Sequence, residues 1–180
     1  MTHAPSDTRR ERDFLGDLDI PAAAYWGVHS ARAVANFPIS GQTVAQMPEL
    51  VRALAFVKKA AAQTNLELGA IDAVRAEAIV KACDDLIRGE LHEQFVVDVI
   101  QGGAGTSTNM NANEVIANRA LEHLGHAKGR YEHLHPNDHV NASQSTNDVY
   151  PTALRVAAWF GIDALLVAMA DLRGAFEAKA

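Results

Sequence analysis

Apolar residues recur at helical spacing in two neighbouring parts of the first half of the chain. Between Pro48 and Gly69 the recurring positions are Leu50, Leu54, Val57 and Ala61. A proline fits the first turn of a helix because an N–H there would have no partner, and a glycine commonly ends one. The same spacing continues from residue 72 to residue 88, just before Gly89. The pattern predicts one helix over about 48–69 and a second over 72–88.

A third helix is predicted farther along the chain. An apolar stretch leads into three glycines within four residues, and helical spacing resumes after them. Asn111 suits an N-cap, with Glu114 three residues on as its capping-box partner. We expect this helix to run from about Asn111 to about Gly125. Residues 126–143 are polar and are predicted to form a connection.

The last segment has the pattern of a helix packed against other helices. From Val149 onward, apolar residues recur at 4-3-4-3-4 spacing, at Ala158, Ile162, Leu165, Met169, Leu172 and Phe176. A single helix cannot bury such a seam by itself. We therefore expect residues 144–180 to begin a helical-bundle domain. Its other helices would come from sequence outside this chain, from other subunits, or from both.

The opening of the chain lacks this periodicity. Residues 1–12 are polar with mixed charge, and we expect them to form a flexible tail. Residues 14–41 are rich in glycine, proline and short apolar runs, which is typical of ordered but irregular structure. The whole pattern predicts a mainly α fold. A helical N-terminal domain over 13–143, with an irregular, short-strand opening, precedes the first long helix of the incomplete bundle.

Composition and charge narrow the class of protein. Hydrophobic residues make up 48% and charged residues 21%, which is ordinary for a globular protein, and the net charge of -6 gives no basic footprint for nucleic acid. No signal-peptide core is present in 1–12, and no later stretch approaches the roughly 20 apolar residues of a membrane span. The single cysteine, Cys83, lies in an apolar run that predicts a buried structural thiol. We expect a cytoplasmic protein with no nucleic-acid or membrane partner.

One polar segment that suits a ligand spans residues 101–114. Its glycines allow close backbone approach, and hydroxyl and amide side chains then lead into a helix start. Neutral donors and free N–H groups at a helix N-terminus favour a small anion. A capped helix after a flexible turn explains the pattern equally well. A phosphate-binding loop is excluded because no lysine lies between Lys81 and Lys128.

A second polar segment spans residues 135–148. Ser145, Thr146 and Asn147 form a triplet of neutral donors immediately before the long helix. Their side chains, together with the first backbone N–H groups of the helix, suit a carboxylate. The alternative is an N-cap with polar neighbours.

Histidines crowd the region between the third and last predicted helices. Five occur within seventeen residues, at His123, His126, His133, His135 and His139. No cysteine accompanies them and the acidic neighbours follow no metal-ligand spacing, so we predict no metal site. His139 is instead a candidate hydrogen-bonding member of the polar loop.

The two polar segments are similar to the first two signature regions of the aspartase/fumarase superfamily. The matching motifs are Gly103-Ala104-Gly105-Thr106-Ser107-x-Asn109-Met110-Asn111-x-Asn113-Glu114 and His135-Pro136-Asn137-Asp138-His139-Val140-Asn141-x-x-Gln144-Ser145-Thr146-Asn147-Asp148. The family's opening is resembled by Asp13-Phe14-Leu15-Gly16, Ile20-Pro21, Tyr25-Trp26-Gly27-Val28-His29 and Asn36-Phe37-Pro38-Ile39-Ser40-Gly41. The resemblance runs from about Glu11 to the last residue.

Within that superfamily, the residues at a few positions of these motifs favour the aspartase branch over class II fumarases. Aspartases typically read Gly-Thr-Ser and Gln-Ser-Thr-Asn-Asp where fumarases read Gly-Thr-Gln and Gln-Ser-Ser-Asn-Asp. This chain has Gly105-Thr106-Ser107 and Gln144-Ser145-Thr146-Asn147-Asp148. The resemblance implies reversible elimination of ammonia from L-aspartate to give fumarate. The alternative is hydration of fumarate to malate by a class II fumarase.

The resemblance also implies roles for single residues. Thr106, Ser145, Thr146 and Asn147 match the family positions that bind the substrate's β-carboxylate. Abstracting a proton beside a carboxylate becomes feasible when the charge moves into that group as an enediolate (aci-carboxylate) held by preorganised donors. The reaction needs no organic cofactor, and activation by a divalent metal cannot be read from the residues.

A peripheral site and an assembly follow from the same resemblance. His135, Asn137 and Asp138 resemble a second anion site of fumarases, although a structural loop is the favoured interpretation here. Family members are longer homotetramers whose active sites each draw on three subunits. The serine base, a Thr-His pair and a Lys-x-Asn segment are expected downstream, so these 180 residues alone are expected to be inactive. A non-catalytic oligomerisation piece is the alternative from a different functional class.

Overall fold

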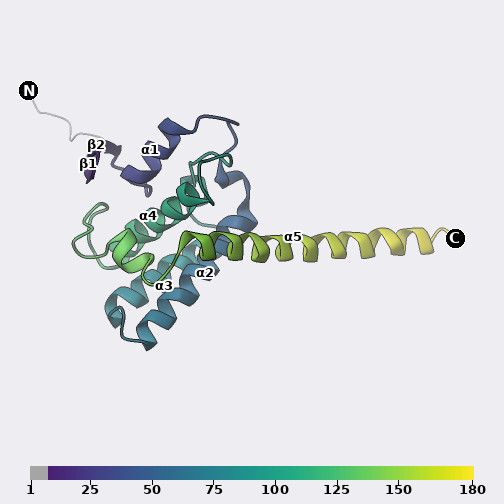
Figure 1. Ribbon diagram of the computed structural model, residues 1–180. Coiled ribbons are helices and arrows are strands. Elements are labelled where there is room, and N and C mark those ends of the chain that lie inside the picture. Colours follow the sequence, from purple (N-terminus) through teal and green to yellow (C-terminus); the bar gives the residue numbers. More distant parts are fainter. Residues whose placement is uncertain (1–7) are drawn as a thin grey trace, which may run out of the picture.

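The computed structural model describes residues 8–180 and shows a helical domain from which one long helix projects (Figure 1). Strands β1, Thr8–Asp13, and β2, Gly16–Pro21, form an antiparallel hairpin with Thr8 opposite Pro21. All other elements among the described residues are helical. The predicted mainly α fold with a short-strand opening is confirmed.

The predicted flexible tail is wrong for residues 8–12, which lie in β1; residues 1–7 lie outside the described residues. Polar contacts hold this strand in place. The Arg9 guanidinium donates to four backbone carbonyls beyond the hairpin turn, those of Pro21, Ala22, Ala24 and Trp26. A strand that is held by polar contacts needs no apolar pattern, so its sequence cannot be told from that of a polar tail.

Helix α1, Val28–Asn36, lies within the stretch predicted to be irregular. No side chain of its own segment caps it. Its first turn is held instead by the Glu114 carboxylate, which accepts the backbone N–H groups of Gly27, His29 and Ser30. Because that cap comes from a distant part of the chain, the local sequence carries no helix-start signal.

Helices α2, Pro48–Glu67, and α3, Ala73–Ile87, confirm the two helices predicted from apolar spacing. They pack side by side, and Asp72 caps α3 by accepting the backbone N–H of Arg75. Two 3-10 turns, η1 (Val44–Gln46) and η2 (His92–Gln94), lie on either side of this helix pair in the sequence.

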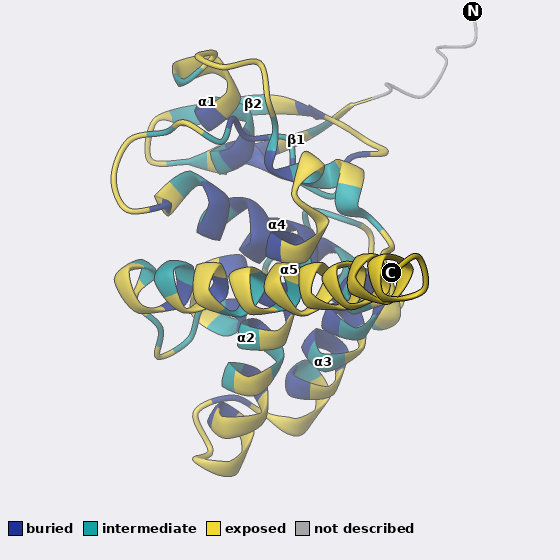
Figure 2. Cartoon of the chain, turned by 90° about the vertical axis from the view of Figure 1, so that its right-hand side faces the viewer, coloured by how far each residue is buried: buried dark blue, intermediate teal, exposed yellow. Residues whose placement is uncertain are grey.

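Helix α4, Thr106–His123, passes through the middle of the domain and is buried along most of its length (Figure 2). The prediction that it starts near Asn111 is wrong by five residues. Its first turn is capped from outside by the Gln101 side chain, which accepts the backbone N–H of Thr108 and donates to its hydroxyl. Glu114 is fully buried and binds α1, so it is no capping-box partner of Asn111.

The predicted connection over 126–143 contains one short helix, the π-helical turn η3, Pro136–Val140. His135 precedes this turn and caps it, since its Nδ1 accepts the backbone N–H groups of Asn137 and Asp138. The turn packs against α4 and leads into α5.

Helix α5, Thr146–Glu177, starts three residues before Val149 and projects beyond the domain (Figures 1 and 2). Its first turns pack on α2, where the Phe56 and Phe160 rings are 5.8 Å apart. Only Val149 and Ala153 of this helix are buried. The large apolar residues farther along are exposed, at Trp159, Ile162, Leu165, Leu166, Val167, Met169, Leu172 and Phe176. Within residues 8–180 this part of the seam has no cover, and the origin of the helices that would cover it stays a prediction.

One helix, α5, is long and apolar enough to cross a membrane by length and composition, with a mean hydropathy of 1.7 over its best window. The prediction that no stretch approaches the length and hydropathy of a membrane span is therefore wrong for α5. A core helix of a soluble protein has the same composition, because a helix buried in a bundle needs an apolar surface. The 4-3-4-3-4 seam favours that second explanation.

Candidate functional site

The N-termini of α4 and α5 meet, and they bring the two polar segments together. Asn109, in the first turn of α4, donates from Nδ2 to Thr146 Oγ1 at 3.1 Å. On the same side, Gly105 lies so close to the Tyr150 ring that a Cβ at this position would overlap it. Gly105 also has φ 80°, which glycine adopts at little cost. The glycine is required here by both its backbone conformation and its neighbour.

The hydroxyl groups at the start of α5 accept hydrogen bonds from the protein. Ser145 is the N-cap, and its Oγ accepts the backbone N–H of Asn147 at 3.2 Å. Thr146 Oγ1 accepts from Asn109. An acceptor hydroxyl keeps its own proton for another partner. Ser145 and Asn147 are exposed and Thr146 is half-buried, so a ligand can reach all three.

Thr106 is the first residue of α4, one helical turn before Asn109. No hydrogen bond within residues 8–180 joins Thr106 directly to Ser145, Thr146 or Asn147. The structure thus brings the two predicted donor groups to one corner through Asn109 and Tyr150, without a direct bond between them.

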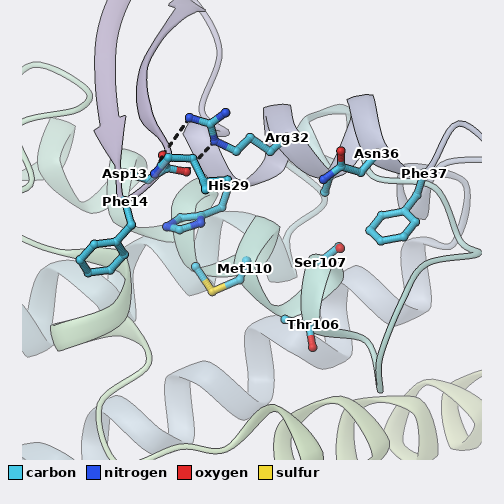
Figure 3. Close-up of a pocket in the computed structure, with 11 residues that line it drawn as sticks. Asp13, Phe14, His29, Arg32, Asn36, Phe37, Thr106, Ser107 and Met110 are labelled. Atoms are coloured by element: carbon cyan, nitrogen blue, oxygen red, sulfur yellow. Dashed lines mark hydrogen bonds and ion pairs between the residues drawn. The ribbon is translucent and has the colours of Figure 1, made fainter.

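Thr106 lines a pocket of about 310 Å³ between α1, α4 and the hairpin turn (Figure 3). The side chains drawn around it come mainly from the N-terminal segment, with Ser107 and Met110 from α4. At its edge, Arg32 binds Asp13 through two hydrogen bonds of 2.6 and 2.8 Å. This bond to Arg32 lowers the pKa of the Asp13 carboxyl. Because Arg32 is paired with Asp13, the uncharged donors that line this pocket are the side chains of Asn36, Thr106 and Ser107.

His29 was not singled out as a site residue from the sequence, yet it lines both this pocket and a neighbouring one. Its backbone N–H donates to Glu114 Oε1 at 2.8 Å, which fixes the start of α1. Burial raises the pKa of the Glu114 carboxyl, while bonds from Ser30 and from backbone N–H groups oppose that shift. The position of His29 depends on a buried acid more than eighty residues away, which no local pattern reveals.

The three residues of the predicted peripheral anion site lie together. His135, Asn137 and Asp138 line a pocket of about 540 Å³, with Arg12, Asp13, Phe14 and His29 on its other side. His135 Nδ1 caps η3, so only the Nε2 side of its ring is available to a ligand. The Asp138 carboxylate lies 3.5 Å from His135 Nδ1 and adds negative charge to this pocket.

The other histidines of the crowded segment take up separate contacts. The His126 and His133 rings stack 3.8 Å apart, and His123 Nε2 lies 2.8 Å from Asp85. His139 Nδ1 accepts the backbone N–H of His135 at 2.8 Å, and burial lowers the pKa of this imidazole. His139 is thus a hydrogen-bonding member of the loop, as the alternative to metal binding predicted. No group of three or more metal-binding side chains forms within residues 8–180.

Cys83 is fully buried in α3, as predicted for a structural thiol. Burial raises the pKa of its thiol, which disfavours the nucleophilic thiolate. Lys58 is the residue that pattern reasoning passed over. It follows Leu54 by four residues on the apolar face of α2 and is fully buried, so a lysine inside an apolar repeat was the available signal.

Residues 16–180 match the family model described as lyase. The chain belongs to the lyase family. This lyase chain is 57% identical over 174 residues to an aspartate ammonia-lyase of Pseudomonas aeruginosa, and 52% identical over 176 residues to one of Escherichia coli. The matches cover 97% of this chain but 37% of each relative. The lyase chain thus spans little more than a third of the length of these curated relatives.

Solved structures give the same family. A fumarate lyase:delta crystallin from Brucella melitensis, in a crystal structure bound to cobalt, is 60% identical with a TM-score of 0.93. The match covers 96% of the lyase chain and 37% of that chain. A class II fumarase from Schistosoma mansoni is 40% identical, with a TM-score of 0.78 over 83% of this chain and 31% of its own. The fumarase is the more distant of the two.

Proposed function

We propose that this lyase chain contributes the substrate-carboxylate site of an aspartate ammonia-lyase, which reversibly eliminates ammonia from L-aspartate to give fumarate. The observation that carries the proposal is the meeting of two helix N-termini through the Asn109–Thr146 hydrogen bond. Helix N-termini favour anions, and the hydroxyls of Ser145 and Thr146 retain protons to donate.

In the proposed reaction, Thr106, Ser145, Thr146 and Asn147 hold the β-carboxylate while the neighbouring carbon loses a proton. Charge then develops on the carboxylate oxygens as an enediolate, and fixed neutral donors stabilise it without competing as acids or bases. Expulsion of ammonia from the adjacent carbon completes the elimination. The base is proposed to lie outside these 180 residues, so the chain alone is proposed to be inactive.

The assembly proposed is a cytoplasmic homotetramer that needs no organic cofactor. The association of subunits is supported by the exposed apolar seam of α5, since nine large apolar side chains of that helix are exposed within the described chain. We propose that bundle helices of the complete protein and of its partner subunits cover the seam. Substituting Leu165→Asn and Met169→Asn should then weaken association in analytical ultracentrifugation, whereas Lys179→Gln near the helix end should not.

Class II fumarase activity is the second candidate, because the Schistosoma mansoni fumarase shares this fold at 40% identity. The identity of 52–57% to aspartate ammonia-lyases favours the first candidate. The two reactions differ in the leaving group, which is ammonia or water. In the proposal, the carboxylate site contributed by this chain does not contact that group.

A chimera tests the proposal. Residues 1–180 replace the matching segment of the Pseudomonas aeruginosa relative, and fumarate absorbance is followed with L-aspartate and, separately, with L-malate. Turnover of aspartate is expected. Turnover of malate alone would transfer the assignment to fumarase, and a folded, assembled chimera that converts neither substrate would contradict both candidates. The unsubstituted relative serves as the control.

A further inference from the structure

The strongest unexplained feature outside the pockets is the buried Lys58. Its side chain is fully inaccessible, and no carboxylate within residues 8–180 forms an ion pair with it. Its one hydrogen bond runs from Nζ to Asn141 Oδ1 at 2.8 Å. Burial lowers the pKa of this amine to about 7. A buried lysine whose partner is a neutral amide, and not a carboxylate, lowers the stability of the fold, so its presence here calls for an explanation.

The Lys58–Asn141 bond continues into the carboxylate corner. Asn141 Oδ1 also accepts from Asn109 Nδ2 at 3.1 Å, and the same Nδ2 group donates its other proton to Thr146 Oγ1 at 3.1 Å. The chain of contacts is therefore Lys58, Asn141, Asn109 and Thr146, which we call the relay. It links the core of α2 to the first residue of α5.

Each bond in the relay has only one possible direction. An amide oxygen accepts and never donates, so Lys58 Nζ must be the donor to Asn141 whether it is an ammonium or an amine. The opposite end of the Asn141 amide is fixed as well, since its Nδ2 donates to the Gln144 carbonyl at 3.2 Å. With Asn141 Oδ1 pointing at Asn109, the Asn109 amide must present nitrogen to it.

An unsatisfied atom shows that this orientation is imposed on Asn109. Its Oδ1 is buried and has no hydrogen-bond partner within the described residues. A buried acceptor left without a partner costs about 1–3 kcal/mol. Turning the amide over would place Oδ1 against Asn141 Oδ1, two acceptors facing each other, so the relay holds the amide in the position that leaves Oδ1 unpaired.

We propose that Lys58, Asn141 and Asn109 are positioning residues that fix the Thr146 hydroxyl as an acceptor towards the protein and hence as a donor towards the substrate carboxylate. A threonine hydroxyl can otherwise donate or accept, and a hydroxyl that donates to the protein is lost to the substrate. The relay removes that choice before substrate arrives, which is the preorganisation that stabilises developing charge. This inference rests on the proposed function of Thr146.

Kinetics of the chimera test the relay. Lys58→Met keeps the length of the side chain and removes the donor. We expect its melting temperature to stay level or rise, while kcat/KM for L-aspartate falls about tenfold or more, below the 10²–10³-fold loss typical of removing an oxyanion donor outright. Cys83→Ala is the matched control, because Cys83 is fully buried beside Lys58 but outside the relay. It should lower the melting temperature and leave kcat/KM unchanged.

A double-mutant cycle separates positioning from simple stability. The losses of kcat/KM caused by Lys58→Met and by Asn109→Ala should not be additive in the double variant, because either change alone disables the same relay. Additive losses, or an unchanged kcat/KM in Lys58→Met, would overturn the proposal. Should Lys58→Met not fold, Asn109→Asp decides: its carboxylate would accept the Thr146 proton, so kcat/KM should fall at least about tenfold, and an unchanged value overturns the relay.

A neutron structure of the deuterated chimera separates this inference from the proposed function. The deuterium on Thr146 Oγ1 should point away from Asn109, whatever substrate the enzyme turns over. A deuterium directed from Thr146 to Asn109 would overturn the relay even in an active enzyme. Loss of aspartate turnover in the unsubstituted chimera would overturn the proposed function and leave this readout intact.

Discussion

Ser30 Oγ donates to Glu114 Oε2 at 2.6 Å, and both side chains are fully buried. The same carboxylate accepts backbone N–H groups at the start of α1, so one acid of α4 fixes the helix that carries His29 and Arg32 beside the pocket. The N-terminal segment is thereby held against α4 at the site, by charge-assisted hydrogen bonds.

Glu114→Gln should lower the free energy of unfolding by about 1–3 kcal/mol. In either orientation of the new amide, an NH2 group would face at least one N–H donor that now bonds to the carboxylate. Urea unfolding of the 180-residue chain measures the change. Glu67→Gln, at an exposed position in the last turn of α2, is the control and should alter stability by no more than a few tenths. Equal effects of the two substitutions would contradict this role of Glu114.

Gly105→Ala should be much more destabilising than Gly69→Ala. Both glycines have positive φ, 80° and 69°, so both substitutions strain the backbone by about 1 kcal/mol. Only at Gly105 would the new Cβ also overlap the Tyr150 ring, whereas Gly69 has nothing within 4 Å of that position. Thermal unfolding of the two variants measures the difference. Similar melting temperatures would show that α4 and α5 do not meet closely at Gly105.

The fold was predictable where apolar spacing determines it. Helices α2, α3 and α5 begin within three residues of their predicted starts, because each buries or presents one apolar stripe. Helix α1 was missed because Glu114, a side chain distant in sequence, accepts its first N–H groups. The start of α4 was placed too late because its first turn is bonded by Gln101, five residues before the helix, and not by an N-cap side chain. A capping-box pattern describes only a cap at the helix start itself, and neither helix has one.

The sequence predicted the donor residues of the site but not the hydrogen bonds that connect them to other residues. The hydroxyl and amide triplet of α5 and the threonine of α4 were named from composition at a helix start, and the structure brings their segments to one corner. The contribution of Lys58 was hidden, since a lysine at an apolar position carries no information about its partner until Asn141 is placed in space. His29 was hidden for the same reason, because Glu114 places it.

Thr146→Val in the chimera should reduce kcat/KM for L-aspartate by about 100-fold, the loss expected for removing one oxyanion donor. Valine keeps the shape of threonine and removes the hydroxyl. Thr152→Val, at an exposed position of the next turns of α5, is the control and should leave the rate unchanged. A rate loss smaller than about threefold in Thr146→Val would remove Thr146 from the carboxylate site.

Stability should depend on pH through Lys58. Burial lowers the pKa of its amine from 10.5 to about 7 in the folded chain, so above pH 7 the unfolded chain binds more protons than the folded one. The free energy of unfolding therefore rises with pH from about 7, by at most about 1.4 kcal/mol per pH unit. Urea unfolding between about pH 7 and pH 8 measures this slope before an exposed thiol, with a pKa of about 8.5, is half titrated.

Lys58→Met should remove that slope, because methionine does not titrate. Lys59→Met is the matched control: Lys59 is the next residue of α2, but it is bonded to Asp84 and only partly buried. Its substitution should leave the slope in place. An identical pH dependence in the wild-type chain and Lys58→Met would contradict the burial of a titrating lysine at this position.

The most direct measurement of the central claim is a crystal structure of the chimera with succinate, an unreactive dicarboxylate. The account predicts one succinate carboxylate at the corner between α4 and α5, with its oxygens about 2.7–3.1 Å from the hydroxyls of Thr106 and Thr146. The Asn109–Thr146 hydrogen bond should remain in place. Succinate bound elsewhere, with this corner occupied by water alone, would contradict the account.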